Sequence, residues 1–329
     1  MRLNILSTTA AALLLVAPSA MAQTLRLTPD ADATVRSDMP ATNYGAATEL
    51  GLAKNKNTSG IYFMRTFFKF DVTSLKGKPI RNATLYFLEN RTIAAGGLPV
   101  TAYGLTQSFV ESRVTWSNKP SDDGKALSSV NIGDNLNRGW KKFDITSLVA
   151  SWGSGATNNG MVIRLARESS AGAYRPGWGP SRDHPTASMR PYLLVDVTAV
   201  RVFDKGCGPV ATWPRLRATS GTPKLNTQMT VTGTLLKPSS IGLTVVGLSN
   251  TFWGAVKLPL MLDPIPGPPC QLLVSLDVVL ASATNNLGQQ SLTFTVPNDQ
   301  KLIGVKVFLQ MATLGKTSHM TDGLDLLIH

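Results

Sequence analysis

The chain of 329 residues is 43% hydrophobic and only 16% charged, and it carries a formal net charge of +12 at pH 7. The basic excess is spread over both halves, with 21 basic and 14 acidic residues in 23–198 and 10 basic and 6 acidic residues in 199–329, which excludes a cationic tail. For an exported protein, this positive field favours an acidic polysaccharide or a cell-envelope glycan as the partner, and not nucleic acid.

Residues 1–22 have the features of a secretory signal peptide. A basic start at Arg2 is followed by an apolar run at 10–17 and by the small-residue site Ala20-Met21-Ala22. The apolar run is too short to span a bilayer, and no later stretch is long and apolar enough for a transmembrane helix. We expect cleavage after Ala22 and a mature protein that is secreted or held at the cell surface.

The remaining length suggests two domains. Gly, Pro, Thr and Ser interrupt the chain at short intervals, and almost no apolar periodicity of 3.6 residues is sustained, which is typical of all-β sandwiches and jelly rolls. We predict an N-terminal jelly-roll β-sandwich over 23–198, a linker over 199–212, and a smaller, immunoglobulin-like β-sandwich over 213–329.

The first domain divides into short predicted strands and turns. One short helix is expected after Asp144, since Leu148, Val149 and Trp152 have helical spacing, with Thr146 or Ser147 as its N-cap and Gly153 as its end. A polar loop is expected around 122–124. The predicted strands are 25–27, 31–35, 50–54, 61–70, 81–88, 99–105, one within 111–120 that ends in a turn, 140–144, 161–165 and 190–197.

The strand at 61–70 contains the first candidate binding residues. Alternation places Arg65, Phe67, Lys69 and Asp71 on one face and the segment's other aromatic residues on the opposite face, which we assign to the core. The face with two cations suits an anionic or sugar-like ligand, although an ordinary half-exposed strand has the same pattern. Residues 142–147 repeat the Lys-Phe-Asp-hydrophobic-Thr-Ser sequence, so Asp71 and Thr73 are interpreted as a strand-to-turn device.

Six motifs follow one another in the first half of the chain: Asp30–Val35, Asn43–Gly45, Arg65–Asp71, Glu111–Pro120, Phe143–Thr146 and Arg190–Leu193. Their order and spacing resemble the DNRLRE domain, also classed as carbohydrate-binding module family 96, over residues 24–198. The resemblance implies a jelly roll of secreted or surface proteins, some of which bind anionic polysaccharide such as alginate.

The resemblance also implies that basic residues around the second and third strands contact sugar carboxylates. Lys54, Arg65 and Lys69 occupy those positions in this sequence. The family's Ser-Arg-Glu loop appears as Ser181-Arg182-Asp183-His184, a departure that puts any family-wide role of this loop in doubt. Trp178, within the Gly- and Pro-rich segment 175–180, is expected on a loop and is a further candidate for contact with sugar.

The second half reads as short strands at regular spacing. Its Gly-Leu-Ser-Asn-Thr-x-Trp-Gly motif at 247–254 and Val-Pro-Asn-Asp motif at 296–299 resemble a recurrent, uncharacterised C-terminal domain of secreted bacterial proteins. Cys207 and Cys270 are the two cysteines of the chain, and outside the cytoplasm they predict one disulfide.

Oxygen atoms of Asp30, Asp32 and Asn43 near the first strand could hold a structural calcium ion, with turn and strand-end hydrogen bonding as the alternative. No cofactor is otherwise expected. The chain lacks His-Glu-x-x-His, Gly-x-Ser-x-Gly, P-loop and Cys-x-x-Cys patterns, and Glu111, Glu168 and Asp183 are not expected to form a catalytic pair.

We therefore predict a secreted, non-catalytic carbohydrate-binding protein for acidic, alginate-like polysaccharide. Two other functions stay open at this point. One is a structural or adhesive protein of the cell surface or extracellular matrix, and the other is a polysaccharide-degrading enzyme.

Overall fold

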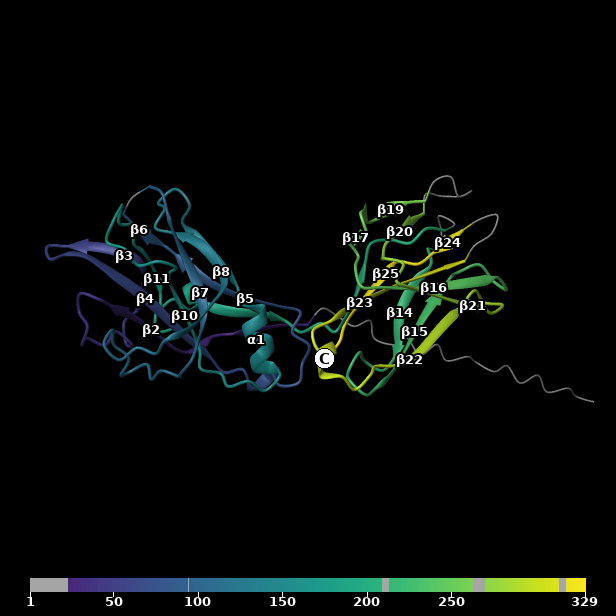
Figure 1. Cartoon of the computed structure of the whole chain (residues 1–329), viewed down its shortest axis with the longest axis horizontal. Helices are drawn as coiled ribbons and strands as arrows, with labels where there is room; N and C mark the ends of the chain where they lie inside the picture. Colours follow the sequence, from purple (N-terminus) through teal and green to yellow (C-terminus); the bar gives the residue numbers. More distant parts are fainter. Residues whose placement is uncertain (1–22, 94, 209–212, 263–269, 314–317) are drawn as a thin grey trace, which may run out of the picture.

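The computed structural model describes residues 23–93, 95–208, 213–262, 270–313 and 318–329. Within these ranges the chain is mostly strand, with one α-helix, α1 (Thr146–Gly153), and three short 3-10 helices, η1 (Thr73–Leu75), η2 (Ala187–Met189) and η3 (Gln300–Leu302). The predicted all-β class is confirmed, and Figure 1 shows two lobes of packed sheets. No helix in the described ranges is long and apolar enough to cross a membrane. The predicted signal peptide lies outside them.

The first lobe is a sandwich of two antiparallel sheets. The smaller sheet has the order β1 (Thr24–Leu27), β12 (Tyr192–Asp196), β5 (Asn82–Glu89) and β9 (Gly139–Asp144). The larger sheet has the order β6 (Arg91–Thr92), β11 (Gly177–Pro180), β3 (Glu49–Asn57), β4 (Gly60–Phe70), β10 (Met161–Leu165), β7 (Leu98–Leu105) and β8 (Asp122–Ile132), with β2 (Pro29–Arg36) also paired to β4. The core between the sheets includes the fully buried Phe68, Phe70, Phe87 and Phe143.

Strand β4 is buried on both faces, which alternation alone did not predict. Phe68 and Phe70 face the main core, whereas Phe67 belongs to a second cluster with Phe109 and Val114. Residues 106–121, predicted to contain a strand, instead form turns, and this segment supplies the cover over Phe67. Strand β8 in turn begins at Asp122, where a polar loop was expected.

The repeated strand-to-turn device is present at both of its positions. The Asp71 carboxylate accepts hydrogen bonds from the backbone and hydroxyl of Thr73, and Asp144 does the same for Thr146. Helix α1 forms where predicted, but its N-cap is Ile145 and no side chain caps it, because the Thr146 hydroxyl is bonded to Asp144 and to the backbone N–H of Ala83.

The second lobe is a smaller sandwich. One sheet has the order β13 (Val200–Phe203), β25 (Gly323–Leu327), β23 (Lys306–Thr313), β16 (Ile241–Gly247) and β21 (Val278–Ala283), with β24 (His319–Met320) also paired to β23. The opposing sheet has the order β14 (Arg215–Ser220), β15 (Gln228–Thr234) and β22 (Gln290–Thr295). Two small hairpins are β17 (Phe252–Trp253) with β18 (Val256–Lys257), and β19 (Leu260–Met261) with β20 (Gln271–Leu272).

The predicted linker 199–212 is in part a strand of the second lobe, since Val200 to Phe203 form β13 and pair with β25. The junction is tied further by Arg81 of the first lobe. Its guanidinium group forms an ion pair with Asp325 of β25 and donates to the backbone carbonyls of Thr198 and Ala199. The boundary between the lobes is therefore held by an ion pair and by hydrogen bonds, and it is not a free linker. Residues 209–212 lie outside the described ranges.

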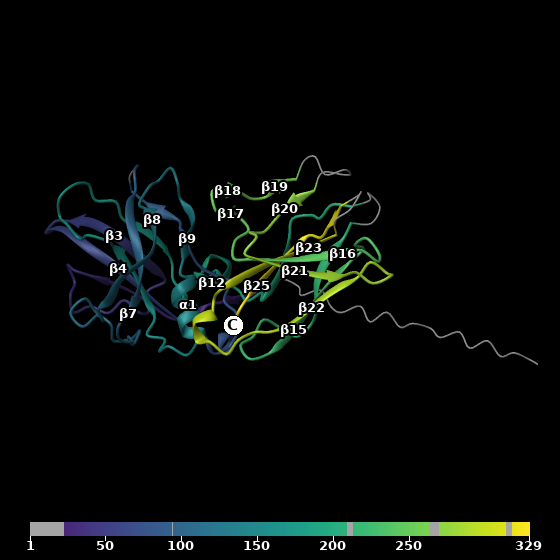
Figure 2. The same ribbon diagram turned by 45° about the vertical axis from the view of Figure 1, so that its right-hand side comes forward.

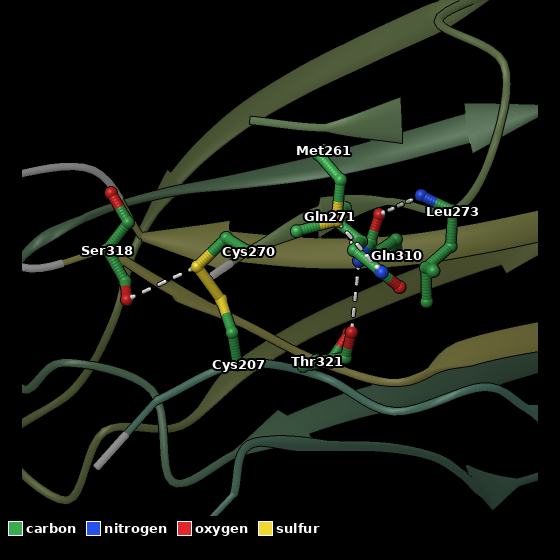
Figure 3. Close-up of a disulfide and its surroundings, with 8 residues drawn as sticks. All are labelled: Cys207, Met261, Cys270, Gln271, Leu273, Gln310, Ser318 and Thr321. Carbon is green, nitrogen blue, oxygen red and sulfur yellow. Dashed lines mark hydrogen bonds between the residues drawn. A yellow bond between two sulfur atoms is a disulfide. The ribbon is translucent and has the colours of Figure 1, made fainter. Parts of the chain in front are cut away.

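The predicted disulfide between Cys207 and Cys270 is confirmed (Figure 3), with a Cα–Cα distance of 5.1 Å. Cys207 exchanges two backbone hydrogen bonds with Met320 of β24. Next to it, the buried Gln310 side chain accepts from the backbone of Leu273 and donates to the carbonyls of Gln271 and Thr321. The disulfide thus links the segment after β13 to the start of β20.

Candidate functional site

Lys54 was predicted as a surface cation that contacts sugar, but the structure buries this side chain and leaves its sugar contact an untested prediction. It is only 5% exposed, and its ammonium group donates to the backbone carbonyls of Ser169 at 2.9 Å and Ala171 at 2.5 Å. A buried lysine whose donors are occupied in this way holds a loop in place. The 169–171 segment that covers it is more than a hundred residues away in sequence, and local pattern could not reveal it.

Arg65 lies on the outer face of β4, as predicted, but its charge is already paired. Its guanidinium group binds the Glu168 carboxylate through two hydrogen bonds of 2.8 Å each, and it lies 5.0 Å from the ring centre of Trp116. The Lys69 ammonium group, on the same face, donates to the Ser108 hydroxyl at 2.9 Å. An anionic ligand would have to displace Glu168 to reach Arg65, whereas Lys69 offers a weakly held cation.

Trp178 lies on a strand, β11, and not on a loop as its glycine and proline neighbours suggested. It is directly opposite Gly51 of β3 on one side and Arg91 of β6 on the other. A Cβ atom at Gly51 would lie 3.3 Å from Cδ1 and Nε1 of the indole and 2.6 Å from the Met64 sulfur. Because Gly51 has no side chain, the Trp178 indole can pack closely against β3.

Trp178 forms one side of a surface hollow with a volume of about 560 Å³, which we call the Trp178 hollow. Its polar and aromatic lining residues are Thr34, Arg36, Tyr44, Thr48, Glu49, Arg91 and Trp178. Two aromatic rings and several polar groups around one concave surface are the combination that binds a sugar ring, which has an apolar face and a polar edge.

Tyr44 is positioned by the residues on either side of it. The Asn43 side-chain amide donates to the carbonyls of Glu111 at 2.8 Å and Val114 at 2.7 Å and accepts from the backbone of Gly45. A side chain at Gly45 would collide with the Glu111 carbonyl group. The Asn43-Tyr44-Gly45 motif thus fixes the turn that presents Tyr44 to the hollow.

The charged residues that line the hollow are two arginines and one glutamate. The Arg91 guanidinium group lies 4.3 Å from the ring centre of Trp178 and 2.5 Å from Glu49, in an ion pair whose side chains are 51% and 45% exposed. An ion pair this exposed contributes only about 0–1 kcal/mol. A ligand carboxylate can therefore replace Glu49 at Arg91 at little cost.

Arg36, the second arginine of the hollow, is more firmly held. It forms two hydrogen bonds with Asp38 and lies 4.5 Å from the ring centre of Tyr62 and 5.6 Å from that of Tyr44. The hydrogen bonds to Asp38 raise the pKa of Arg36 above its usual value. The hollow therefore has a fixed cation at Arg36 and an adaptable one at Arg91.

The structure does not bring all the predicted ligand residues together. Met64 lines the Trp178 hollow, and alternation along β4 directs its neighbour Arg65 to the opposite side of the strand. Lys69 shares the face of Arg65. Of the four predicted ligand residues, Trp178 lines the hollow. The arginines Arg36 and Arg91 were missed, since neither stands in a motif that distinguishes it from other surface cations.

The three residues proposed for calcium do not form an open oxygen cage. The Asn43 amide is fully used by the chain, and Asp32 accepts a hydrogen bond from the backbone of Arg182 at 2.7 Å. No group of three or more acidic, His or Cys side chains suited to a metal ion occurs in the described ranges. Calcium binding at Asp30 and Asp32 stays an untested prediction.

Calcium should not change the thermal stability of the mature protein if turn and strand-end hydrogen bonds explain this segment. We expect the same unfolding midpoint in excess calcium and in excess chelator, measured by far-UV circular dichroism. A midpoint that rises with calcium and loses that rise in an Asp30→Asn variant would establish the metal site instead.

The candidate catalytic carboxylates are engaged in separate ion pairs. Glu168 binds Arg65, and Glu111 lies 2.9 Å from Arg182 while accepting the backbone N–H of Asp32 at 2.8 Å. Asp183 lies 3.8 Å from the same Arg182. Each carboxylate thus faces a guanidinium group of the chain.

A second hollow, of about 570 Å³, lies on the second lobe beside Trp213. The Lys205 ammonium group is 5.1 Å from the ring centre of Trp213, and Arg217 pairs with Asp322 at 2.8 Å. Burial raises the pKa of Asp322, although its bond to Arg217 opposes this effect. This exposed tryptophan serves below as a control for Trp178.

Comparisons with known proteins identify a family match within the first lobe. Residues 23–178 match the model of carbohydrate-binding module family 96. The tRNA nuclease WapA of Bacillus subtilis (strain 168) is 28% identical over 197 residues, and the tRNA3(Ser)-specific nuclease WapA of Bacillus spizizenii is 27% identical over 197 residues. These alignments cover 56% of this chain but 8% of each nuclease, so the chain spans less than a tenth of their length.

Among solved structures, red sea bream transglutaminase is 9% identical, with a TM-score of 0.18 over 93% of this chain and 31% of that one. A likeness at this level supports no conclusion about fold or function.

Proposed function

Because residues 23–178 belong to carbohydrate-binding module family 96, we propose that this chain is a non-catalytic protein that binds acidic polysaccharide outside the cytoplasm, with the Trp178 hollow as its site. The observation that carries the proposal is the pairing of Trp178 with Arg91 at 4.3 Å on the rim of a concave surface. An indole ring packs against the apolar face of a sugar, and an adjacent guanidinium group binds a carboxylate through two parallel hydrogen bonds.

The acidic specificity rests on charge. Two arginines and one glutamate line the hollow, and the whole chain carries +12. The carboxylate of a uronate residue can form an ion pair with Arg91 that replaces the pair with Glu49. A neutral sugar has no carboxylate, so it would gain no ion pair if Arg91 left Glu49. Lys69 stays a candidate for a more distant unit of the same polymer, on the opposite side of β4 from the hollow.

Trp178→Ala should weaken binding of an acidic oligosaccharide by about 10- to 100-fold, the range for an aromatic residue at the centre of a binding surface. The measurement is isothermal titration of the mature chain with oligomers of alginate and of polygalacturonate. Arg91→Ala should weaken binding and also reduce its dependence on salt, because it removes a charge–charge contact. Trp213→Ala is the matched control and should bind like the parent protein.

Three results would contradict the proposal. The parent protein would bind no acidic glycan, or it would bind a neutral oligosaccharide of equal length just as tightly, or Trp178→Ala and Trp213→Ala would have equal effects. Release of new reducing ends or unsaturated products by the purified protein would point to the enzyme alternative.

A further inference from the structure

Strand β21 is an exposed apolar edge of the second lobe. All six of its residues are exposed, and Val278, Val279 and Leu280 are 41–49% exposed. The strand pairs with β16 in an unbroken register from Ala283 back to Val278, so no β-bulge in this pairing interrupts its other side. An uninterrupted edge with apolar side chains is a surface on which a further strand can pair.

Some side chains of β21 point to the core side of their sheet, but the opposing sheet has no strand beyond β22 to cover them. Val278 is directly opposite Val246, which packs against the core cluster of the second lobe, so both point to the core side. The opposing sheet ends at β22, whose Leu292 and Phe294 are only partly buried against the same cluster. In both views β21 and β22 lie next to each other at one side of the lobe (Figures 1 and 2). The sandwich is therefore open along this side.

The other edges of the four large sheets carry positive charge. Apart from β21 and β22, each strand that ends one of these four sheet orders contains at least one Arg or Lys, namely Arg26 in β1, Lys141 and Lys142 in β9, Arg91 in β6, Lys125 in β8, Arg201 in β13, and Arg215 and Arg217 in β14. Charged residues on an edge prevent association with another edge. Strands β21 and β22 lack such residues, and they are the two that lie side by side.

We propose that β21 is a dimer interface, at which a second copy of this chain pairs antiparallel through its own β21. In a basic chain, two copies can approach most closely where neither carries charge. A two-fold axis perpendicular to the sheet does not exchange its two faces, so the side chains that point to the core side in one copy lie on the same face as those of the other copy. With Leu280 on the axis, Val278 meets Ser282 and Val279 meets Ala281, so each valine faces a small side chain. The sheet continues through both copies, and the Val278 and Leu280 side chains of each cover the open end of the other.

Sedimentation equilibrium of the mature chain should give a dimer. Leu280→Lys places two ammonium groups opposite each other and should weaken the dimer by at least about 100-fold, since like charges brought together cost several kcal/mol. Ser282→Lys adds a charge at a position that is already exposed and should also weaken it, which guards against a folding defect at Leu280. Val202→Lys, an equally apolar site on the opposite edge strand β13, should leave the dimer intact.

Leu280→Cys provides a positive test, because it should form a disulfide-linked dimer on mild oxidation whereas Val202→Cys should not. The proposal fails if the parent chain is a monomer at the highest attainable concentration. It also fails if Leu280→Lys and Ser282→Lys dimerise like the parent, or if Leu280→Cys does not cross-link. Trp178→Ala should stay dimeric, which separates this interface from the glycan site.

Discussion

Arg81→Met should destabilise the chain by about 3–5 kcal/mol, the cost of leaving one charge of a buried ion pair without its partner. The side chains of Arg81 and Asp325 are only 4% and 11% exposed, and one carboxylate oxygen of Asp325 has no hydrogen-bond partner in the described ranges. Removal of Arg81 also leaves the carbonyls of Thr198 and Ala199 without a side-chain donor. Urea unfolding, followed by tryptophan fluorescence and by far-UV circular dichroism, measures the effect.

The matched comparison is Arg91→Met, which breaks the exposed pair with Glu49 and should change stability by less than about 1 kcal/mol. The double variant Arg81→Met/Asp325→Leu removes both charges and should regain much of the loss, because no lone charge stays buried. Since this ion pair joins the two lobes, we also expect the single variant to separate their unfolding transitions. Equal, small losses for Arg81→Met and Arg91→Met would show that the junction contributes little.

The regular parts of the fold could be predicted from the sequence because they depend on local chemistry. Alternation located most strands, and the Phe-Asp-hydrophobic-Thr-Ser repeat identified the turn in which Asp71 and Asp144 each bond a threonine. The disulfide followed from a single pair of cysteines. The interacting groups of the turns are neighbours in sequence, and each cysteine has only one other cysteine with which it can pair.

The site and the junction depend on contacts between distant residues, and here the sequence was insufficient. Lys54 looked like a surface cation until residues 169–171 covered it. Arg81 and Asp325 are separated by 244 positions, so 199–212 was read as a plain linker. Trp178 was assigned to a loop because glycine and proline surround it, yet Gly51 on a neighbouring strand provides the space that its ring requires.

Asp32 is one of two buried carboxyl groups of the first lobe, the other being Glu89, and we expect it to make the stability of the protein depend on pH. It is 1% exposed, and its second oxygen has no hydrogen-bond partner among the described residues. Burial raises its pKa from 3.8 to about 7, and the nearby carboxylates of Glu111 and Asp183 add to this effect. The hydrogen bond from the Arg182 backbone and the Arg182 charge oppose it.

The direction of the pH dependence follows from this raised pKa. Between pH 4 and 7 the folded chain keeps the Asp32 proton while the unfolded chain has lost it, so stability falls as the pH rises through this window. The penalty is complete above pH 7 and reaches about 4 kcal/mol, from about 1.4 kcal/mol for each unit of pKa. Asp32→Asn keeps an acceptor for the Arg182 backbone but cannot ionise. It should therefore be more stable than the parent at pH 8, and this gain should shrink by about 2–3 kcal/mol at pH 5.

Urea unfolding of both proteins at pH 5 and pH 8 tests this expectation. Asp30→Asn, an exposed change on the same strand, is the control and should shift stability by similar small amounts at both pH values. Parallel pH profiles for the parent and Asp32→Asn would show that water reaches the carboxylate and that burial does not perturb it. A gain that is larger at pH 8 than at pH 5 would instead show that the buried Asp32 carboxyl group favours the folded state in mildly acidic surroundings, where uronate carboxylates are still ionised and available to Arg91.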